Sequence, residues 1–315
     1  MSYLQDMFKL LSTLAINLCE CLSMSRSCVT CALDTHNSHL LGHRGARGEY
    51  FENTQAGFQH TQRLQQSFPN HLVGIEFDVQ LTLDGHLVVF HDESLLRLYG
   101  RQSRIDQLST AEIKRLNKKN SAASQPAIVT LDEMPKWLST YQHIELEIKT
   151  HSRTNYQALI KALRRCLAHP DFDSLPITLT SFDLRLHYYL QIDSFLSHLP
   201  RGLLVEPLSW SLSELPSVFS PSGTLTDSSS ADRLNTLPLS THQMLYDTPS
   251  LAARLGCSSL GLYYPLFNAS VIQRCQYYGL STTAWTVNQP QQAINLIELG
   301  VNYVITDYPT LFLQQ

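Results

Sequence analysis

Short apolar runs alternate with helical stretches along most of the chain. Eight runs have the composition and length of strands, and strands that alternate with helices are typical of a parallel sheet covered by helices. The pattern therefore predicts an α/β protein with the (β/α)8 architecture, the TIM barrel. The predicted strands are 39–44, 72–79, 143–149, 177–182, 201–206, 258–264, 281–287 and 301–307. The predicted helices include 54–66, 131–141, 155–167, 184–193, 269–278 and 291–299.

A ninth apolar run, 86–91, follows the second strand after only a short turn. The dipeptide Asp84-Gly85 before it is a strong hairpin signal, whereas a parallel strand would need a crossover of a dozen or more residues. We therefore predict an antiparallel hairpin. With a two-residue loop at Asp84-Gly85, Asp78 would lie opposite His91 at the mouth of the barrel.

The chain divides into an N-terminal segment, 1–38, which is predicted to be helical, and a barrel domain, 39–315. Residues 93–126 form an insertion after the hairpin, and insertions at the catalytic end of a barrel commonly shape substrate access. Residues 209–241 are rich in Ser, Leu and Pro, and we interpret them as a loop without catalytic residues.

The N-terminal segment bears on localisation. No run of about 18 apolar residues occurs, so no transmembrane helix is expected. The apolar run 10–18 is similar to the core of a signal peptide, but Asp6, Lys9 and Glu20 do not fit one. We interpret residues 1–25 as an amphipathic helix that could pack on the barrel, mediate dimerisation or contact a membrane peripherally. We expect a cytoplasmic protein, with export or membrane association through this segment as the alternative.

The charge and the cysteines narrow the class of protein. A net charge of −4 argues against general nucleic-acid binding, which favours a basic face, but a small anionic substrate needs only a few local cations. Seven cysteines without a regular framework fit a reducing compartment. Four of them crowd the N-terminus and are interpreted as free thiols rather than a zinc site: Cys19, Cys21, Cys28 and Cys31.

Three carboxylates fall at the ends of two predicted barrel strands. Glu76 and Asp78 lie two positions apart and share one face of their strand, and Glu147 occupies the next barrel strand. Barrel active sites lie at these strand ends, where converging carboxylates would repel one another without a cation. Oxygen ligands suit Mg²⁺ or Ca²⁺. The sequence therefore predicts one divalent cation on Glu76, Asp78 and Glu147, with Glu52 as a further ligand or an orienting group.

Two histidines and two cations accompany the carboxylates. Two imidazoles beside an Arg, a Lys and a metal site form a set that can cleave a phosphodiester, because one imidazole can take a proton from the nucleophile and the other can protonate the leaving alcohol. We therefore predict that His43 and His91 form the acid/base pair, and that Arg44 and Lys149 hold the phosphate oxygens. Trp285 is a candidate wall of the substrate pocket, with a core position as the alternative. The nucleophile stays open between a neighbouring glycerol hydroxyl, which would give a cyclic phosphate, and water.

These residues belong to a longer series of motifs. In chain order they are His43-Arg44-Gly45, Glu52-Asn53-Thr54, Glu76-x-Asp78-Val79, Thr82-x-Asp84-Gly85, His91-Asp92, Glu147-x-Lys149, Thr180-Ser181-Phe182, Trp285-Thr286-Val287-Asn288 and Thr306-Asp307-Tyr308-Pro309. The series resembles the glycerophosphodiester phosphodiesterase family of the PLC-like phosphodiesterase superfamily, and the resemblance covers roughly residues 39–312.

The resemblance implies metal-dependent hydrolysis of glycerophosphodiesters, such as glycerophosphocholine or glycerophosphoethanolamine, to glycerol 3-phosphate and an alcohol. It also implies the same three metal ligands. One alternative keeps the chemistry but acts on lysophospholipids, as a lysophospholipase D; the polar, basic insertion favours the soluble diester. An alternative of another class is a non-catalytic barrel that binds phosphodiesters or a protein partner. The complete set of site residues argues against it.

Overall fold

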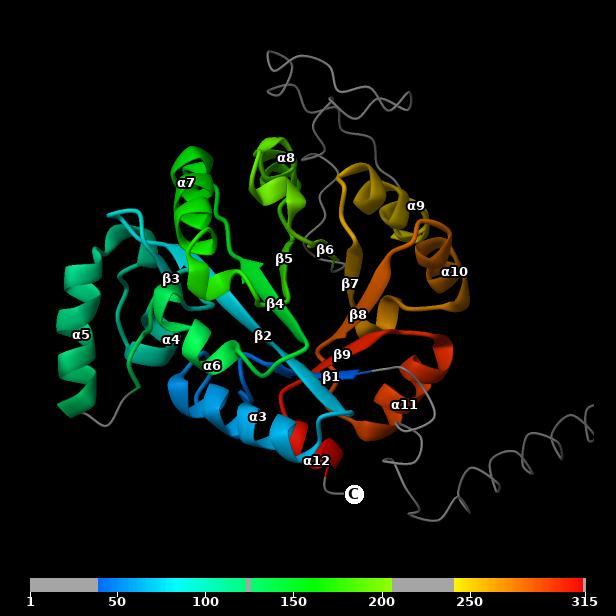
Figure 1. The fold of residues 1–315 in the computed structure, drawn as a ribbon, viewed down its shortest axis with the longest axis horizontal. Coiled ribbons are helices and arrows are strands. Elements are labelled where there is room, and N and C mark those ends of the chain that lie inside the picture. The colour runs from blue at the N-terminus through cyan, green and yellow to red at the C-terminus, as the bar shows by residue number, and fades with distance from the viewer. Residues whose placement is uncertain (1–38, 123–125, 206–240, 314–315) are drawn as a thin grey trace, which may run out of the picture.

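Eight parallel strands close into a barrel in the computed structural model, which describes residues 39–122, 126–205 and 241–313. Their order is β1-β9-β8-β7-β6-β5-β4-β2, and β2 pairs with β1 to close the ring. Figure 1 shows the helices arranged around this ring of strands. The predicted (β/α)8 architecture is confirmed. The predicted N-terminal helix in 1–38 and nearly all of the predicted loop 209–241 lie outside the described residues.

Every predicted barrel strand is present, with ends that differ by at most two residues. The strands are β1 (His39–His43), β2 (Leu72–Leu81), β4 (His143–Ile148), β5 (Ile177–Ser181), β6 (Arg201–Val205), β7 (Ser259–Tyr263), β8 (Ser281–Trp285) and β9 (Tyr303–Thr306). The helices around them are α3 (Gln55–Ser67), α6 (Pro135–Leu138), α7 (Tyr156–Leu167), α8 (Leu184–Ile192), α9 (Thr241–Arg254), α10 (Ala269–Tyr277), α11 (Pro290–Leu299) and α12 (Pro309–Leu313). None of the helices in the described ranges has the length and apolar composition to cross a membrane.

Short polar side chains fix where several helices begin. Thr54 accepts a hydrogen bond from the Gly57 backbone at the start of α3, and Asn155 and Asn268 cap α7 and α10 in the same way. Such caps satisfy backbone N–H groups that have no partner within the helix. The Thr54 cap makes α3 begin directly after Glu52-Asn53, so the chain between β1 and α3 stays short and close to the barrel.

Two helix predictions need correction. The predicted helix 131–141 is broken into a 3-10 turn (Leu131–Glu133) and the short α6, which starts at Pro135 because proline lacks the N–H that a continuous helix needs. The helix α9 was not predicted, because the segment before β7 was interpreted as a loop up to residue 241.

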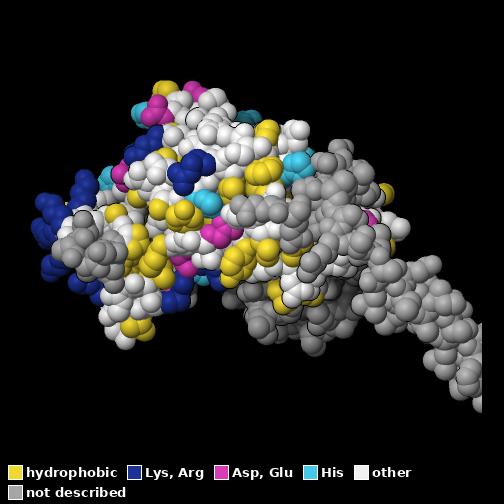
Figure 2. Space-filling view, turned by 90° about the horizontal axis from the view of Figure 1, so that it is seen from below, with side chains coloured by type: hydrophobic (Ala, Val, Ile, Leu, Met, Phe, Trp, Pro, Cys, Tyr) yellow, Lys and Arg dark blue, Asp and Glu magenta, His cyan; other side chains and the backbone are white. Residues whose placement is uncertain are grey.

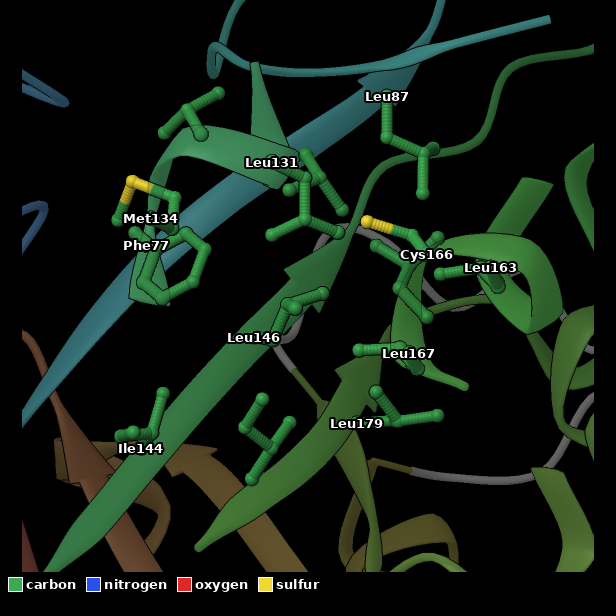
Figure 3. Close-up of a cluster of buried hydrophobic side chains, with 14 of the residues drawn as sticks. Phe77, Leu87, Leu131, Met134, Ile144, Leu146, Leu163, Cys166, Leu167 and Leu179 are labelled. Carbon is green, nitrogen blue, oxygen red and sulfur yellow. The ribbon is translucent and has the colours of Figure 1, made fainter. Parts of the chain in front are cut away.

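Successive side chains of β2 point alternately into the hydrophobic core outside the barrel and into the barrel interior. Phe77 is fully buried in an apolar cluster between the strands and the outer helices, together with Leu146 of β4 and Leu179 of β5. Figure 3 shows Phe77 beside Met134, and Leu146 and Leu179 on the side of the cluster where Leu167 of α7 lies. Because neighbouring residues of a strand point to opposite faces, the residues on either side of Phe77 point into the barrel.

The insertion packs around a small core of its own. It contains α4 (Leu96–Tyr99), a 3-10 turn (Ile105–Gln107) and α5 (Thr110–Ala122). The buried residues of this small core are Leu95, Ile105, Ile113 and Leu116 of the insertion, with Val88, Phe90 and Ile128 from the segments on either side of it. Figure 2 shows Lys and Arg side chains gathered at the end of the molecule where α5 lies; the exposed ones on this helix are Lys114, Arg115, Lys118 and Lys119. The insertion is therefore an ordered structure that can hold residues at the barrel mouth.

The hairpin between β2 and β3 (Leu87–Val89) is antiparallel as predicted, but its predicted register is wrong by one residue. The backbone N–H of Phe90, not that of His91, faces Asp78 and donates to its carbonyl oxygen at 3.0 Å. A shift of one residue reverses which face each side chain occupies. The last backbone hydrogen bond of the hairpin is made by Phe90, so His91 lies just beyond the paired part of the strand.

The length of the hairpin loop explains this shift. Three residues, Leu83-Asp84-Gly85, form the loop, and the backbone N–H of Thr82 pairs with the carbonyl oxygen of His86. Gly85 has a φ of 78°, as in a three-residue loop that ends with a left-handed glycine. The Asp84 carboxylate accepts from the Thr82 hydroxyl at 2.7 Å and stabilises this longer turn.

Candidate active site

The loop after β1 is hydrogen-bonded to the carboxylates of β2. Arg44 and Asn53 have φ values of 50° and 55°, a region that few non-glycine residues adopt. The Arg44 N–H donates to Glu76 Oε2 at 3.1 Å, and the Asn53 side-chain amide donates to Asp78 Oδ2 at 2.9 Å. The Asn53 N–H also donates to the Arg44 carbonyl oxygen at 2.9 Å. These bonds hold the loop in a single arrangement above the strand.

This loop also depends on a close approach at Gly42. A Cβ atom there would lie 2.0 Å from the carbonyl oxygen of Gly45, so Gly42→Ala must displace the loop. We expect this change to lower the free energy of unfolding by about 1–3 kcal/mol, as for other overpacked sites, and to lower activity. Gly57→Ala in α3 is the control, because its nearest neighbour would be at 3.5 Å. Urea denaturation compares the two; equal stability would show that the loop tolerates the methyl group.

Glu76, Asp78 and Glu147 form a buried group of carboxylates. One oxygen of each lies within 4.8 Å of the others, since Asp78 and Glu147 are direct neighbours in the register of β2 and β4. Burial and the nearby charges of Asp78 and Glu147 raise the pKa of Glu76 well above its usual value. Burial and Asp78 also raise the pKa of Glu147 to about 7, against the opposing effect of Lys149. Two of the three carboxylates therefore resist ionisation.

Asp78 behaves in the opposite way, although it is fully buried. Burial opposes its ionisation, but Lys149 and Arg44 outweigh burial and hold its pKa well below the usual range. Lys149 Nζ lies 3.1 Å from Asp78 Oδ1, and Arg44 Nε lies 3.2 Å from Oδ2. Lys149 also pairs with Glu147. The two cations that the sequence assigned to phosphate thus contact the carboxylates directly.

The donor set fits a hard divalent cation. Glu76 Oε1 is buried and has no hydrogen-bond partner among the described residues. An unpaired buried oxygen is costly, and here it lies beside two more carboxylates whose charges repel its own. Mg²⁺ and Ca²⁺ bind carboxylate oxygens in such groups. The residues Glu76, Asp78 and Glu147 can therefore hold the predicted cation.

His43 is anchored from the end of β9. Its Nδ1 lies 2.5 Å from Asp307 Oδ1, and its Nε2 lies 3.7 Å from Glu76 Oε2. Asp307 is fixed in turn by the Asn288 amide at 2.8 Å and by Arg47 Nε at 3.1 Å. Burial lowers the pKa of His43, with Asp307 opposing the change. Asp307 thus fixes the orientation of the His43 ring.

His91 is anchored by its neighbour in the sequence. Its Nδ1 lies 2.7 Å from Asp92 Oδ1. The Gln80 side-chain amide donates to the carbonyl oxygens of Phe90, His91 and Asp92 at 3.0, 3.0 and 2.7 Å, which holds this turn against β2. Burial lowers the pKa of His91 to about 4. Both histidines are thus held through Nδ1, which leaves Nε2 for other contacts.

Glu52 contacts two arginines. Its oxygens accept from Arg44 at 2.9 Å and from Arg97 at 2.7 Å, and it is not one of the three carboxylates that converge. Arg97, one of the basic residues of the insertion, is a site residue that the sequence analysis does not single out. No local signal could have found this pair, because 45 residues separate Arg97 from Glu52.

These residues surround one cavity of about 520 Å³ at the barrel mouth. Seven of the predicted site residues line it: His43, Arg44, Glu76, His91, Glu147, Lys149 and Trp285. Asp78 is fully buried beneath them. The Trp285 ring meets Phe182 edge to face at 5.4 Å, so these two aromatic residues form an apolar wall beside the charged groups. The cavity thus offers an anion-binding side and an apolar side.

Comparison with protein families decides the class of this site. The model of the glycerophosphoryl diester phosphodiesterase family matches residues 43–311. The chain belongs to this family. As a member of the glycerophosphoryl diester phosphodiesterases it is a phosphoric diester hydrolase, and the family resemblance seen in the sequence is confirmed.

Known relatives of the chain include other members of the family. It is 26% identical over 280 residues to a glycerophosphodiester phosphodiesterase of Caldanaerobacter subterraneus, which covers 86% of this chain and 94% of the relative. A shorter match, 37% over 76 residues, relates it to a human lysophospholipase D and covers 24% of this chain and 22% of the relative. Among solved structures, an Oleispira antarctica phosphodiesterase in complex with its product sn-glycerol 3-phosphate shares the fold. The TM-score is 0.66 at 22% identity, with coverage of 90% of this chain and 98% of the other.

Proposed function

We propose that this phosphodiesterase hydrolyses glycerophosphodiesters such as glycerophosphocholine or glycerophosphoethanolamine. The products would be glycerol 3-phosphate and an alcohol, and one Mg²⁺ or Ca²⁺ ion would be held by Glu76, Asp78 and Glu147. The observation that carries the proposal is the convergence of these buried carboxylates with two anchored histidines around one cavity. The glycerol 3-phosphate product bound by the Oleispira relative supports the choice of substrate.

His43 and His91 would carry the proton transfers. Asp92 and Asp307 are carboxylates, because hydrogen bonds and nearby cations lower the pKa of each, and a carboxylate can only accept a hydrogen bond. The Nδ1 atom of each histidine therefore carries a proton, and Nε2 of the neutral ring can accept one. One ring would take a proton from the attacking oxygen at its Nε2, and the other, after taking up a proton from solvent at its own Nε2, would give that proton to the leaving alcohol. The attacking oxygen is either the neighbouring glycerol hydroxyl or water.

Charge at the phosphate would be balanced by groups that already lie in the cavity. Arg44 and Lys149, which form ion pairs with Asp78, would bind the non-bridging oxygens. When bound, the divalent cation would neutralise the carboxylates and polarise the phosphate. Phe182 and Trp285 would cover the apolar part of the substrate and exclude water.

The cation should stabilise the protein more at high pH than at low pH. The raised pKa values of Glu76 and Glu147 mean that the metal-free folded state holds protons that the unfolded chain has released. Stability without metal therefore falls as pH rises from about 4.5 toward 7. We expect Mg²⁺ or Ca²⁺ to raise the melting temperature at pH 8 and to have little effect at pH 5. Thermal unfolding in EDTA and in added cation measures this, and an equal shift at both pH values would argue against carboxylate ligands.

A second candidate activity is lysophospholipase D, with the same catalytic groups. Exposed aromatic residues lie at or after the C-terminal ends of three barrel strands, where a lipid tail would approach: Tyr50, Phe51, Tyr263 and Tyr308. The short match to a human lysophospholipase D agrees with this candidate. Rates on glycerophosphocholine and on lysophosphatidylcholine decide between them. A higher kcat/KM on the lysophospholipid would replace the soluble diester as the preferred substrate.

The remaining proposals concern partners and place. We propose a small-molecule substrate and no nucleic acid, in line with the net charge of −4. We propose a cytoplasmic location, with export or membrane association through residues 1–25 as the alternative; both rest on the sequence pattern of the N-terminal segment. Fractionation compares cells that produce the full chain with cells that produce a chain starting at residue 39. Recovery of the full chain alone with membranes would support the membrane contact, and recovery of both forms in the soluble fraction would contradict it.

A further inference from the structure

Arg97 lies at the centre of an ion-pair network between the insertion and the barrel. Its NH1 and NH2 atoms donate to the two oxygens of Glu52 at 2.7 Å each. Its Nε and NH2 atoms donate to the two oxygens of Asp92 at 2.6 and 2.9 Å. A guanidinium can bind two carboxylates in this manner because its donors form a rigid planar fork.

Each of these carboxylates holds a group of the candidate active site. Asp92 accepts from Nδ1 of His91 at 2.7 Å, and Glu52 accepts from Arg44 at 2.9 Å. Arg97 is therefore one contact removed from His91 on one side and from Arg44 on the other. It comes from α4 of the insertion, whereas Glu52 comes from the loop after β1.

We propose that Arg97 is a positioning residue for the hydrolysis, which fixes His91 and Arg44 relative to each other through Asp92 and Glu52. The proposal rests on the proposed function of the site. It also gives the insertion a defined task, since α4 presents Arg97 to the barrel mouth.

The charges of the cluster support this assignment. Glu52, Asp92 and His91 bring potential ligand atoms within 4.8 Å of one another, an arrangement that needs a positive charge. The guanidinium supplies that charge, so a second metal ion is not required. Without it, two carboxylates would repel each other and Asp92 would turn away from His91.

Because Arg97 is partly exposed, a positioning role can be distinguished from a role in stability. Its side chain is 48% exposed, and the buried carboxylate of Glu52 keeps Arg44 as a second cation when Arg97 is removed, so the free energy of unfolding should change little. Small displacements of a catalytic group can nevertheless lower a rate by about 100-fold. Loss of Arg97 should therefore change turnover far more than stability.

The first experiment compares Arg97→Gln, Arg97→Lys and Arg101→Gln with the wild type on glycerophosphocholine in saturating Mg²⁺ or Ca²⁺. Arg101 is the matched control, since it is exposed in the same insertion and its side chain has no ion pair or hydrogen bond among the described residues. We expect Arg97→Gln to lower kcat by about 10-fold or more, with a change in KM below about 3-fold and nearly the wild-type melting temperature. The kcat of Arg97→Lys should fall between those of the wild type and Arg97→Gln, because an ammonium group keeps the positive charge but lacks the planar fork of donors. Wild-type kcat in Arg97→Gln would overturn the proposal.

A double-mutant cycle with Asp92→Asn tests whether Arg97 acts through Asp92. If it does, adding Arg97→Gln to Asp92→Asn should lower kcat by a smaller factor than Arg97→Gln lowers it in the wild type, because coupled residues are not additive; the loss that remains measures the route through Glu52 and Arg44. Losses that multiply in the double variant would contradict this route. Arg101→Gln added to Asp92→Asn should leave the rate of the single variant unchanged.

A spectroscopic measurement tests the geometry without any turnover. The Nδ1–H proton of His91 should give a downfield NMR signal in ¹⁵N-histidine-labelled protein, identified by its absence in His91→Asn. We expect the signal to be lost in Arg97→Gln and kept in Arg101→Gln. An unchanged signal in Arg97→Gln would overturn the proposal. If the wild type shows this signal but cleaves no glycerophosphodiester, the proposed function fails while the positioning of His91 by Arg97 is still decided.

Discussion

His91→Asn is expected to lower the turnover of glycerophosphocholine by about 100-fold or more, the usual contribution of a general acid or base. His43→Asn should have an effect of the same order. Both rings line the cavity, and each is held through Nδ1 by a carboxylate that leaves Nε2 for proton transfer. His91 is partly exposed, so its loss should change the free energy of unfolding by less than about 1 kcal/mol.

Initial rates at saturating substrate measure this effect, and His86→Asn is the matched control. His86 lies on the same hairpin but does not line the cavity of the site, so its replacement should leave kcat unchanged. Turnover close to that of the wild type in both His43→Asn and His91→Asn would remove the two histidines from the mechanism.

Glu76→Gln and Asp78→Asn should both abolish most of the activity yet affect stability in opposite directions. Without a cation, burial and like charges raise the pKa of Glu76, so a neutral glutamine should be tolerated or stabilising. Asp78 is held ionised by Lys149 and Arg44, and its pKa is lowered. Neutralising Asp78 leaves two buried cations with less compensation, and such changes cost on the order of 3 kcal/mol.

Chemical denaturation of both variants in EDTA at pH 8 measures the difference. The wild type should unfold between the two variants, or close to Glu76→Gln. The difference in stability should be largest at pH 8. At this pH the Glu76 carboxyl is driven to ionise although its pKa is raised, which costs stability, whereas the Asp78 carboxylate is fully charged and stabilises the two cations. An Asp78→Asn variant more stable than Glu76→Gln would show that the charges of the site are arranged differently.

The barrel could be predicted because its strands and helices alternate along the chain, and every barrel strand was found within two residues of its predicted ends. Register was harder to predict. The hairpin was expected to turn on two residues, Asp84-Gly85, but hydrogen bonds of Thr82 extend the loop to three and shift the pairing by one. The helix expected at 131–141 is interrupted for a different reason, since Pro135 cannot continue a helix and instead begins the short helix α6.

In the candidate site, too, contacts within one strand could be predicted from the sequence, whereas contacts between distant segments could not. The spacing of Glu76 and Asp78 on a strand predicted that they share a face, and the β2–β4 register brings Glu147 beside them. The network of Arg97 could not be foreseen, because its partners meet only when the insertion folds against the loop after β1. Long-range ion pairs of this kind follow from the packed structure and leave no periodic signal in the sequence.

The central claim is that this chain cleaves glycerophosphodiesters with the help of a divalent cation. The most direct measurement is the release of glycerol 3-phosphate from glycerophosphocholine by purified protein, with EDTA and after added Mg²⁺ or Ca²⁺. The account predicts release that EDTA stops and that excess cation restores, with Glu76→Gln inactive under every condition. Release that continues in EDTA would contradict the metal site, and no release under any condition would contradict the proposed substrate.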